Sequence, residues 1–157
     1  MKEISERKEN IMIRKLKKED RQLYIEMARE FYHSDAVLHP VPDTHFEKTV
    51  AEALRGNGWA EIFILEYESE TAGYALTARS FSQEAGGTVV WIEEIYIREP
   101  YRSKGLGREF FHYIEKERDP DTVRIRLEVE EENERASALY RQLGYEVLDY
   151  VQMIKDF

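Results

Sequence analysis

Residues 100–110 read P-Y-R-S-K-G-L-G-R-E-F and combine three basic side chains with two glycines. Because glycine has no Cβ atom, Gly105 and Gly107 would let an anion come close to the backbone N–H groups. A helix that begins at this turn would add unpaired N–H donors and the positive end of its dipole. The arginine and lysine side chains would supply charge for phosphate oxygens. The stretch therefore predicts a site for a pyrophosphate group.

Two other phosphate-binding motifs fit the same residues less well. The pattern G-x-x-x-x-G-K-[ST] of nucleotide triphosphate hydrolysis does not occur. Gly105 and Gly107 begin the dinucleotide pattern G-x-G-x-x-G, and Glu128 lies near the distance expected for an acid that binds ribose. However, Phe110 stands where the third glycine would be, and no second strand–helix–strand unit follows. These departures argue against a dinucleotide site.

A metal site has little support in the sequence. Three histidines, His33, His39 and His45, recur every six residues around a proline-containing segment. Six-residue spacing through a loop gives no fixed ligand geometry, and the chain contains no Cys. We therefore expect no bound metal, no disulfide and no Cys nucleophile.

The composition is that of a soluble globular protein, with 42% hydrophobic and 35% charged residues. No apolar run approaches the roughly 20 residues of a membrane span, and the polar N-terminus does not resemble a secretory signal. We therefore expect a cytoplasmic protein without a membrane partner. The net charge of -9 disfavours nucleic-acid binding and favours cationic partners such as amines.

The hydrophobic pattern predicts one mixed α/β domain over 11–157, preceded by a flexible extension at 1–10. Helical spacing alternates with period-two segments rich in β-branched and aromatic residues. Short glycine-containing connections favour a mostly antiparallel central sheet, followed by a β-α-β crossover and flanked by helices. The expected strands lie at 11–15, 61–67, 72–80, 88–98 and 123–129, with a last strand or pair at 145–156; the expected helices lie at 20–32, 44–55, 106–119 and around 136–143.

Two sequence blocks resemble one family. R-S-K-G-L-G at 102–107 is similar to the [RQ]-x-x-G-x-[GA] signature of the GCN5-related N-acetyltransferase (GNAT) superfamily, which binds acetyl-coenzyme A. N-E-R-A-S-A-L-Y-R-Q-L-G-Y at 133–145 resembles that family's N-x-x-A-x-x-L-Y-x-x-x-G-[FY] segment. The blocks lie one strand apart, as in the family, and the likeness covers about 11–156. The resemblance implies a GNAT-like fold.

The resemblance also implies how acetyl-coenzyme A would be held. The backbone of residues 95–97 would hydrogen-bond the pantetheine arm as an added strand does, and the amides of 102–108 would hold the pyrophosphate. Asn133 suits a helix N-cap, and its counterpart in the family also contacts the cofactor. The predicted cofactor-binding residues are Ile95, Tyr96, Ile97, Arg102, Ser103, Lys104, Gly105, Leu106, Gly107, Arg108 and Asn133.

Tyr140 is the predicted acid of the reaction. In many members of the family the matching tyrosine donates a proton to the departing coenzyme A thiolate. Tyr140 also shares a helical face with Ala136 and Leu143. The alternative that Tyr140 only packs in the core therefore stays open.

Glu93 and Glu94 are the candidate bases. An acceptor amine is mostly protonated at neutral pH, and in relatives a carboxylate near this position removes the proton, directly or through water. Because side chains alternate on a strand, Glu93 is expected to share a face with Ile95 and Glu94 to share one with Ile92 and Tyr96. The sequence does not decide between the two carboxylates; we slightly favour Glu93. Either could instead bind the substrate ammonium or face solvent.

The acceptor is the least defined part of the prediction. In the family, the helix–helix region often covers the acceptor pocket, so Phe31 and Tyr32 are predicted substrate-binding residues, together with Glu128. The expected reaction is direct attack of a primary amine, a small cationic one being favoured, on acetyl-coenzyme A. Acetylation of protein N-termini or lysines and a non-catalytic acyl-coenzyme A sensor are the alternatives. The family also contains many dimers, so a homodimer stays open.

Overall fold

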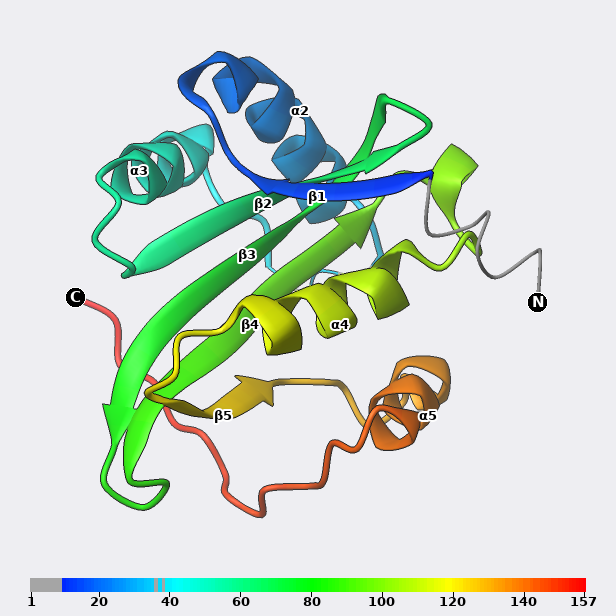
Figure 1. The fold of residues 1–157 in the computed structure, drawn as a ribbon. Coiled ribbons are helices and arrows are strands. Elements are labelled where there is room, and N and C mark those ends of the chain that lie inside the picture. Colours follow the sequence, from blue (N-terminus) through cyan, green and yellow to red (C-terminus); the bar gives the residue numbers. More distant parts are fainter. Residues whose placement is uncertain (1–9, 36, 38) are drawn as a thin grey trace. The chain divides into compact units, whose positions relative to one another are not determined.

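The computed structural model describes residues 10–157 except 36 and 38 (Figure 1). The predicted extension at 1–10 therefore lies, apart from Asn10, outside the described residues. The chain forms two compact units, one extending to Leu127 and the other spanning Glu128–Phe157. The single domain expected over 11–157 stays a prediction.

A five-stranded sheet forms the centre of the first unit. Its strands are ordered β1-β2-β3-β4-β5 along the sheet, so each strand lies beside its neighbour in sequence. The first four pair antiparallel, whereas β4 and β5 pair parallel across a helical crossover. This confirms the predicted mixed α/β fold. The strands are β1 (Ile11–Lys15), β2 (Ala60–Tyr67), β3 (Glu70–Ser82), β4 (Gly87–Ile97) and β5 (Thr122–Leu127).

Helices α2 (Arg21–Tyr32) and α3 (Asp43–Leu54) cover one face of this sheet. Apolar residues at helical spacing give each helix one buried face, and these faces pack against Ile62, Ile64 and Tyr74. Helix α3 begins one residue earlier than expected. Pro42, with its extended backbone, is the N-cap, and Asp43 is the first helical residue.

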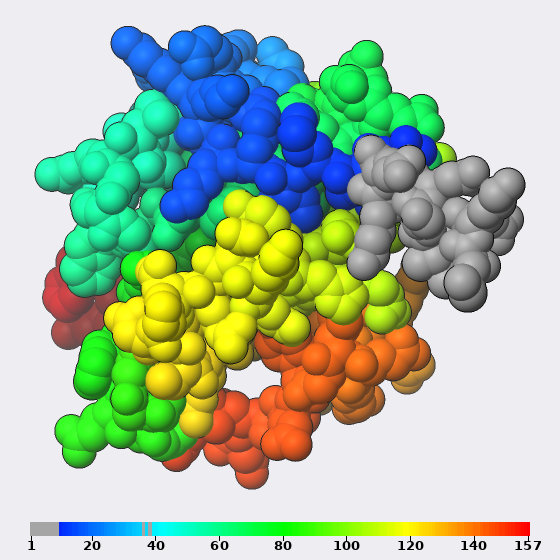
Figure 2. Space-filling model, in the orientation of Figure 1, coloured from blue at the N-terminus to red at the C-terminus, as the bar shows by residue number. Residues whose placement is uncertain are grey.

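Helix α4 (Leu106–Glu117) covers the opposite face. Phe110 and Phe111 on this helix are completely or almost completely buried, and the Phe110 ring lies 5.6 Å from that of Phe63 on β2. The side chains of α4 fill the surface beside β1 in Figure 2. This packing holds α4 against the sheet. It therefore also fixes the position of the glycine turn, where the helix begins.

A salt-bridged arginine joins the first strand to the chain that follows it. Arg14 on β1 makes two hydrogen bonds to Asp20, of 2.7 and 3.0 Å, and a third of 3.0 Å to Glu66 on β2. Asp20 ends the short 3-10 helix η1 (Lys18–Asp20) and also accepts a 2.7 Å hydrogen bond from the Lys17 N–H group. The network sets the direction in which the chain enters α2.

The second unit contains helix α5 (Glu134–Gln142). Asn133 caps it, because its Oδ1 accepts a 3.1 Å hydrogen bond from the Ala136 N–H group. The strand or pair expected at 145–156 does not form in the described structure. No strand of its own unit pairs with this stretch, and Val151, Met153 and Ile154 are exposed.

None of the helices in the described part of the chain is long and apolar enough to span a membrane.

Candidate active site

The glycine turn between β4 and α4 has the backbone geometry that its composition suggests. Gly105 is the N-cap of α4 and has a φ of 86°, a left-handed conformation in which a side chain is strained. Ser103 precedes it with a φ of 62°. Leu106, the first helical residue, is buried and anchors the turn. The first N–H groups of α4 have no partner within the helix, so they are available to bind an anion.

No feature of the protein itself explains why residue 107 is Gly107 rather than another residue. Its φ is not positive, and a Cβ atom added there would meet no atom within 4 Å. Glycine is also a poorer helix former than alanine. Neither backbone nor packing therefore calls for glycine here, whereas a ligand lying against the helix N-terminus would.

The basic side chains of the turn are held by different contacts. Arg102 donates a 3.0 Å hydrogen bond from Nε to the carbonyl of Ile97, which ties the turn to the end of β4. The Lys104 ammonium lies 5.3 Å from the centre of the Tyr67 ring. Arg108 lies in the first turn of α4. All three residues lie within four positions of Leu106, where the helix begins.

Strand β4 has an edge left open by its neighbour. Its parallel pairing with β5 runs from Thr88 to Ile92, where Ile92 faces Leu127. Beyond this point, in the part of the unit that the structure describes, β4 is paired only with β3. Residues 95–97 therefore present backbone groups along the edge where an added strand could bind.

A β-bulge at Glu93 decides how the two carboxylates are placed. Leu76 on β3 pairs with Glu94, but the next residue, Thr77, pairs with Ile92, so Glu93 is the extra residue. Directly opposed residues share a face and adjacent residues do not. Glu94 and Ile92 therefore lie on opposite faces, so the shared face expected for this pair is wrong, whereas the one expected for Glu94 and Tyr96 is confirmed.

Glu94 faces α2, whereas Glu93 is exposed. The Tyr74 hydroxyl group donates a 3.3 Å hydrogen bond to Oε2 of Glu94. Burial raises the pKa of Glu94 above its usual value; hydrogen bonds from Tyr32 and Tyr74 oppose that rise, and the charge of Glu93 adds to it. Such a carboxylate binds a proton more readily than a solvated one, which suits a base.

Aromatic side chains lie around this carboxylate. The Phe31 ring lies 5.3 Å from the Tyr32 ring and 5.7 Å from the Tyr96 ring. The Tyr96 hydroxyl group donates a 3.0 Å hydrogen bond to Glu30, which also receives two hydrogen bonds from Arg98. The predicted residues Phe31 and Tyr32 therefore lie with Glu94 and Tyr96 between α2 and β4.

Three predicted residues belong to the second unit and are described within it. Tyr140 lies on α5 with its ring 6.2 Å from that of Tyr145, and burial raises its pKa. Its phenol therefore keeps its proton at neutral pH, as an acid requires. Asn133 caps α5. Glu128 is exposed and accepts a hydrogen bond from Gln152.

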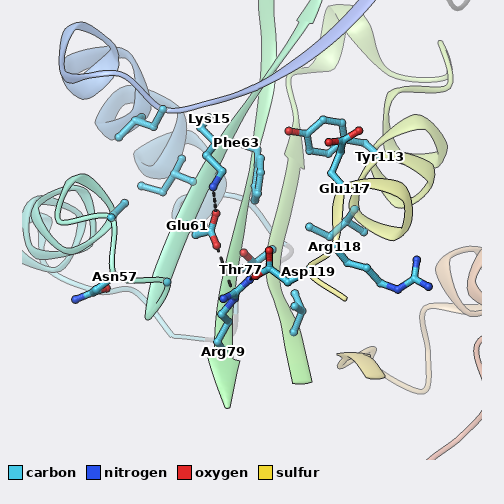
Figure 3. Close-up of a pocket in the computed structure, with 17 residues that line it drawn as sticks. Lys15, Asn57, Glu61, Phe63, Thr77, Arg79, Tyr113, Glu117, Arg118 and Asp119 are labelled. Atoms are coloured by element: carbon cyan, nitrogen blue, oxygen red, sulfur yellow. Dashed lines mark hydrogen bonds and ion pairs between the residues drawn. The ribbon is translucent and has the colours of Figure 1, made fainter. Parts of the chain in front are cut away.

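A cavity of about 320 Å³ lies elsewhere in the first unit, beneath the C-terminal end of α4 (Figure 3). Four of its charged side chains are paired with one another: Glu61 lies 2.7 Å from Lys15 and 3.8 Å from Arg79, and Arg79 also pairs with Asp119. A helix of 12 residues is about 18 Å long, so the cavity is remote from the glycine turn. None of the predicted site residues lines it.

Tyr24 and Tyr74 are the site residues that the sequence did not single out. Both are buried, and their rings meet edge to face at 4.9 Å. Each occurs within an apolar pattern that a core residue explains, and only the pairing of β3 with β4 brings Tyr74 to Glu94. Among the described side chains, no group of three His, Cys, Asp or Glu residues could hold a metal ion.

Solved structures share this fold. A possible acetyltransferase from Clostridium difficile 630 is 22% identical and has a TM-score of 0.78 over 94% of this chain and 98% of its own. The aminoglycoside N-acetyltransferase AAC(6')-Iy, in complex with the bisubstrate analogue CoA-S-monomethyl-acetylneamine, is 15% identical and has a TM-score of 0.77 over 94% and 98%. Ribosomal-protein-alanine N-acetyltransferase from Brucella melitensis is 15% identical and has a TM-score of 0.73 over 94% and 99%.

A family model matches most of the sequence directly. Residues 21–145 match the model of the acetyltransferase (GNAT) family, a range that includes the glycine turn, β4 and α5. The match covers both blocks whose residues resemble that family. The chain therefore belongs to the acetyltransferase (GNAT) family.

Proposed function

We propose that the protein is an N-acetyltransferase that moves the acetyl group of acetyl-coenzyme A to a primary amine. The observation that carries this proposal is the turn at the start of α4, where Gly105 has a left-handed backbone and Gly107 is a glycine that the fold does not need. The helix N-terminus and its surrounding cations suit a pyrophosphate. The open edge of β4 at residues 95–97 suits the amide groups of a pantetheine arm.

Each reacting proton has a proposed place to go. Glu94 takes the proton of the acceptor ammonium, and the free amine then attacks the thioester carbonyl. A backbone N–H group on β4 polarises that carbonyl. After the attack the nitrogen loses its second proton to water, the bond from carbon to sulfur breaks, and the Tyr140 phenol protonates the thiolate and regains a proton from solvent. Because the chain has no Cys, direct transfer is proposed rather than an acyl-cysteine intermediate. Glu93, which is exposed, is the weaker candidate for the base.

The acceptor that we favour is a small cationic amine. The net charge of -9 and the carboxylate between α2 and β4 support it. The similar structures include enzymes named for aminoglycosides, for ribosomal-protein alanine and for glucosamine 6-phosphate, so this fold serves unlike acceptors. Acetylation of protein N-termini or lysines, and a non-catalytic sensor of acyl-coenzyme A, remain the alternative proposals.

The test is a panel of polyamines, amino sugars, amino acids and peptides incubated with acetyl-coenzyme A and analysed by mass spectrometry. We expect an acetylated product from at least one small polyamine or amino sugar, with coenzyme A thiol released in equal amount. Product only from peptides would favour the protein acetyltransferase. Tight coenzyme A binding without any product would favour the sensor, and failure to bind coenzyme A would contradict the whole proposal.

A further inference from the structure

Two tyrosines from different elements act on the same carboxylate. We propose that Tyr32 and Tyr74 are positioning residues that hold Glu94 ready to remove the proton of the acceptor amine. This inference rests on the proposed function, because it assigns the residues that support its base. It starts from the bulge at Glu93, beyond which Glu94 lies on the α2 face with Tyr96 and opposite to Ile92.

Tyr74 is fixed in place by its surroundings. It is completely buried on β3, with the Tyr24 ring at 4.9 Å and the Tyr96 ring at 6.0 Å. The ring therefore has little room to rotate, and its hydroxyl group stays aimed at Oε2 of Glu94 at 3.3 Å.

Tyr32 belongs to another element and lies at the C-terminal end of α2. Its ring packs against Phe31 and Phe46, with both centres 5.3 Å away. Its hydroxyl group lies close enough to Glu94 to lower the pKa of the carboxyl group, as a donor does. One phenol from the sheet, at 3.3 Å, and one from the helix therefore act on the same carboxylate.

The two phenols also stabilise the charged form of Glu94. A half-buried carboxylate without donors would favour its neutral form, and a neutral carboxyl group is no base. The titratable groups that face it are Tyr24 and Tyr32 from α2, Tyr74 from β3 and Glu93 from its own strand. The charge of Glu93 opposes ionisation, so the hydrogen bonds from Tyr32 and Tyr74 are what counter it.

The test measures Glu94 itself. Glutamate labelled with 13C at the side-chain carboxyl group gives a resonance that Glu94→Gln removes and so assigns. We expect Tyr74→Phe and Tyr32→Phe each to raise the pKa of this carboxyl group by about one unit, because each variant removes one donor. The acidic limb of kcat/KM should move by the same amount, while the KM for acetyl-coenzyme A stays unchanged.

Tyr113→Phe is the matched control, because it removes a phenol that packs beside Phe63 on the α4 face of the sheet. It should leave the Glu94 titration where it is. If Tyr74→Phe does not fold, Tyr32→Phe carries the test, since Tyr32 is only half-buried. An unchanged Glu94 titration in the folded variants would overturn the inference. Absence of transfer by the wild type would contradict the proposed function alone, because the titration needs no substrate.

Discussion

A substitution at Gly107 distinguishes an effect on ligand binding from an effect on folding better than one at any other residue of the turn. A Cβ atom at this position points into open space, and a negative charge in the first turn of a helix is favourable for folding. We therefore expect Gly107→Asp to fold at least as stably as the wild type while losing coenzyme A affinity by about 100-fold or more, through repulsion of the pyrophosphate. Calorimetric titration and thermal melting measure the two effects.

Gly107→Asn is the control for shape. It places a side chain of the same size in the same space without the charge, so it should lose clearly less affinity than Gly107→Asp. Equal coenzyme A affinity in the wild type and in Gly107→Asp would show that the pyrophosphate does not lie at the start of α4.

Tyr140 carries the proposed acid role. Its pKa is raised by burial, so the phenol holds a proton that it can give to a thiolate. Tyr140→Phe should lower kcat by about 100-fold, since general acids contribute factors of this order, and should leave the Kd for coenzyme A nearly unchanged. Tyr145→Phe removes a neighbouring phenol of the same unit and should retain most of kcat. A Tyr140→Phe enzyme with full turnover at saturating substrate would refute the assignment.

At the scale of elements, Arg14 and Asp20 couple β1 to the start of α2. Arg14 lowers the pKa of Asp20 below its usual 3.8 by hydrogen bonding and by its charge. A depressed carboxyl pKa contributes stability above the unfolded value, and this contribution is lost as the pH falls through the folded value. Asp20→Asn should therefore lower the free energy of unfolding by about 2 kcal/mol at pH 7, and the difference should shrink below pH 4.

Urea unfolding of both proteins at pH 7 and at pH 3 measures this effect. Asp35→Asn, at an exposed acid, should change stability by no more than about 0.5 kcal/mol at either pH. A deficit of Asp20→Asn that stayed the same at both pH values would mean that the charge of Asp20 does not stabilise the fold.

The helices, strands and glycine turn could be predicted where the sequence pattern that indicates them lies within one short segment. The turn at 102–107 depends on glycines and cations that are adjacent in sequence, and the helices and first five strands follow from side-chain periodicity. The placement of Glu94 opposite to Ile92 could not be predicted, because the bulge at Glu93 arises from pairing with Leu76 and Thr77, 17 and 16 residues away in sequence. Residues 145–156 show the converse: the sequence predicts a strand or pair there, but a strand also needs a partner, and their own unit contains no other strand.

At the scale of the whole molecule, charge is the property that bears on substrate choice. Residues 1–18 carry seven Lys or Arg and three Glu, a net +4, which leaves -13 for the rest of the chain. An acidic body attracts cationic acceptors over distances that salt shortens, from about 30 Å at 0.01 M to about 8 Å at 0.15 M. Raising the salt over this range should increase the KM of a triamine by about threefold and that of a monoamine much less.

The comparison is made at saturating acetyl-coenzyme A, so that salt effects on the basic turn do not enter the KM of the amine. A triamine and a monoamine of the same chain length differ mainly in charge, which makes the monoamine the control for salt effects on the enzyme itself. If both amines respond equally to salt, long-range attraction does not select the acceptor. Specificity would then depend on short-range contacts around Phe31, Tyr32 and Glu94 alone.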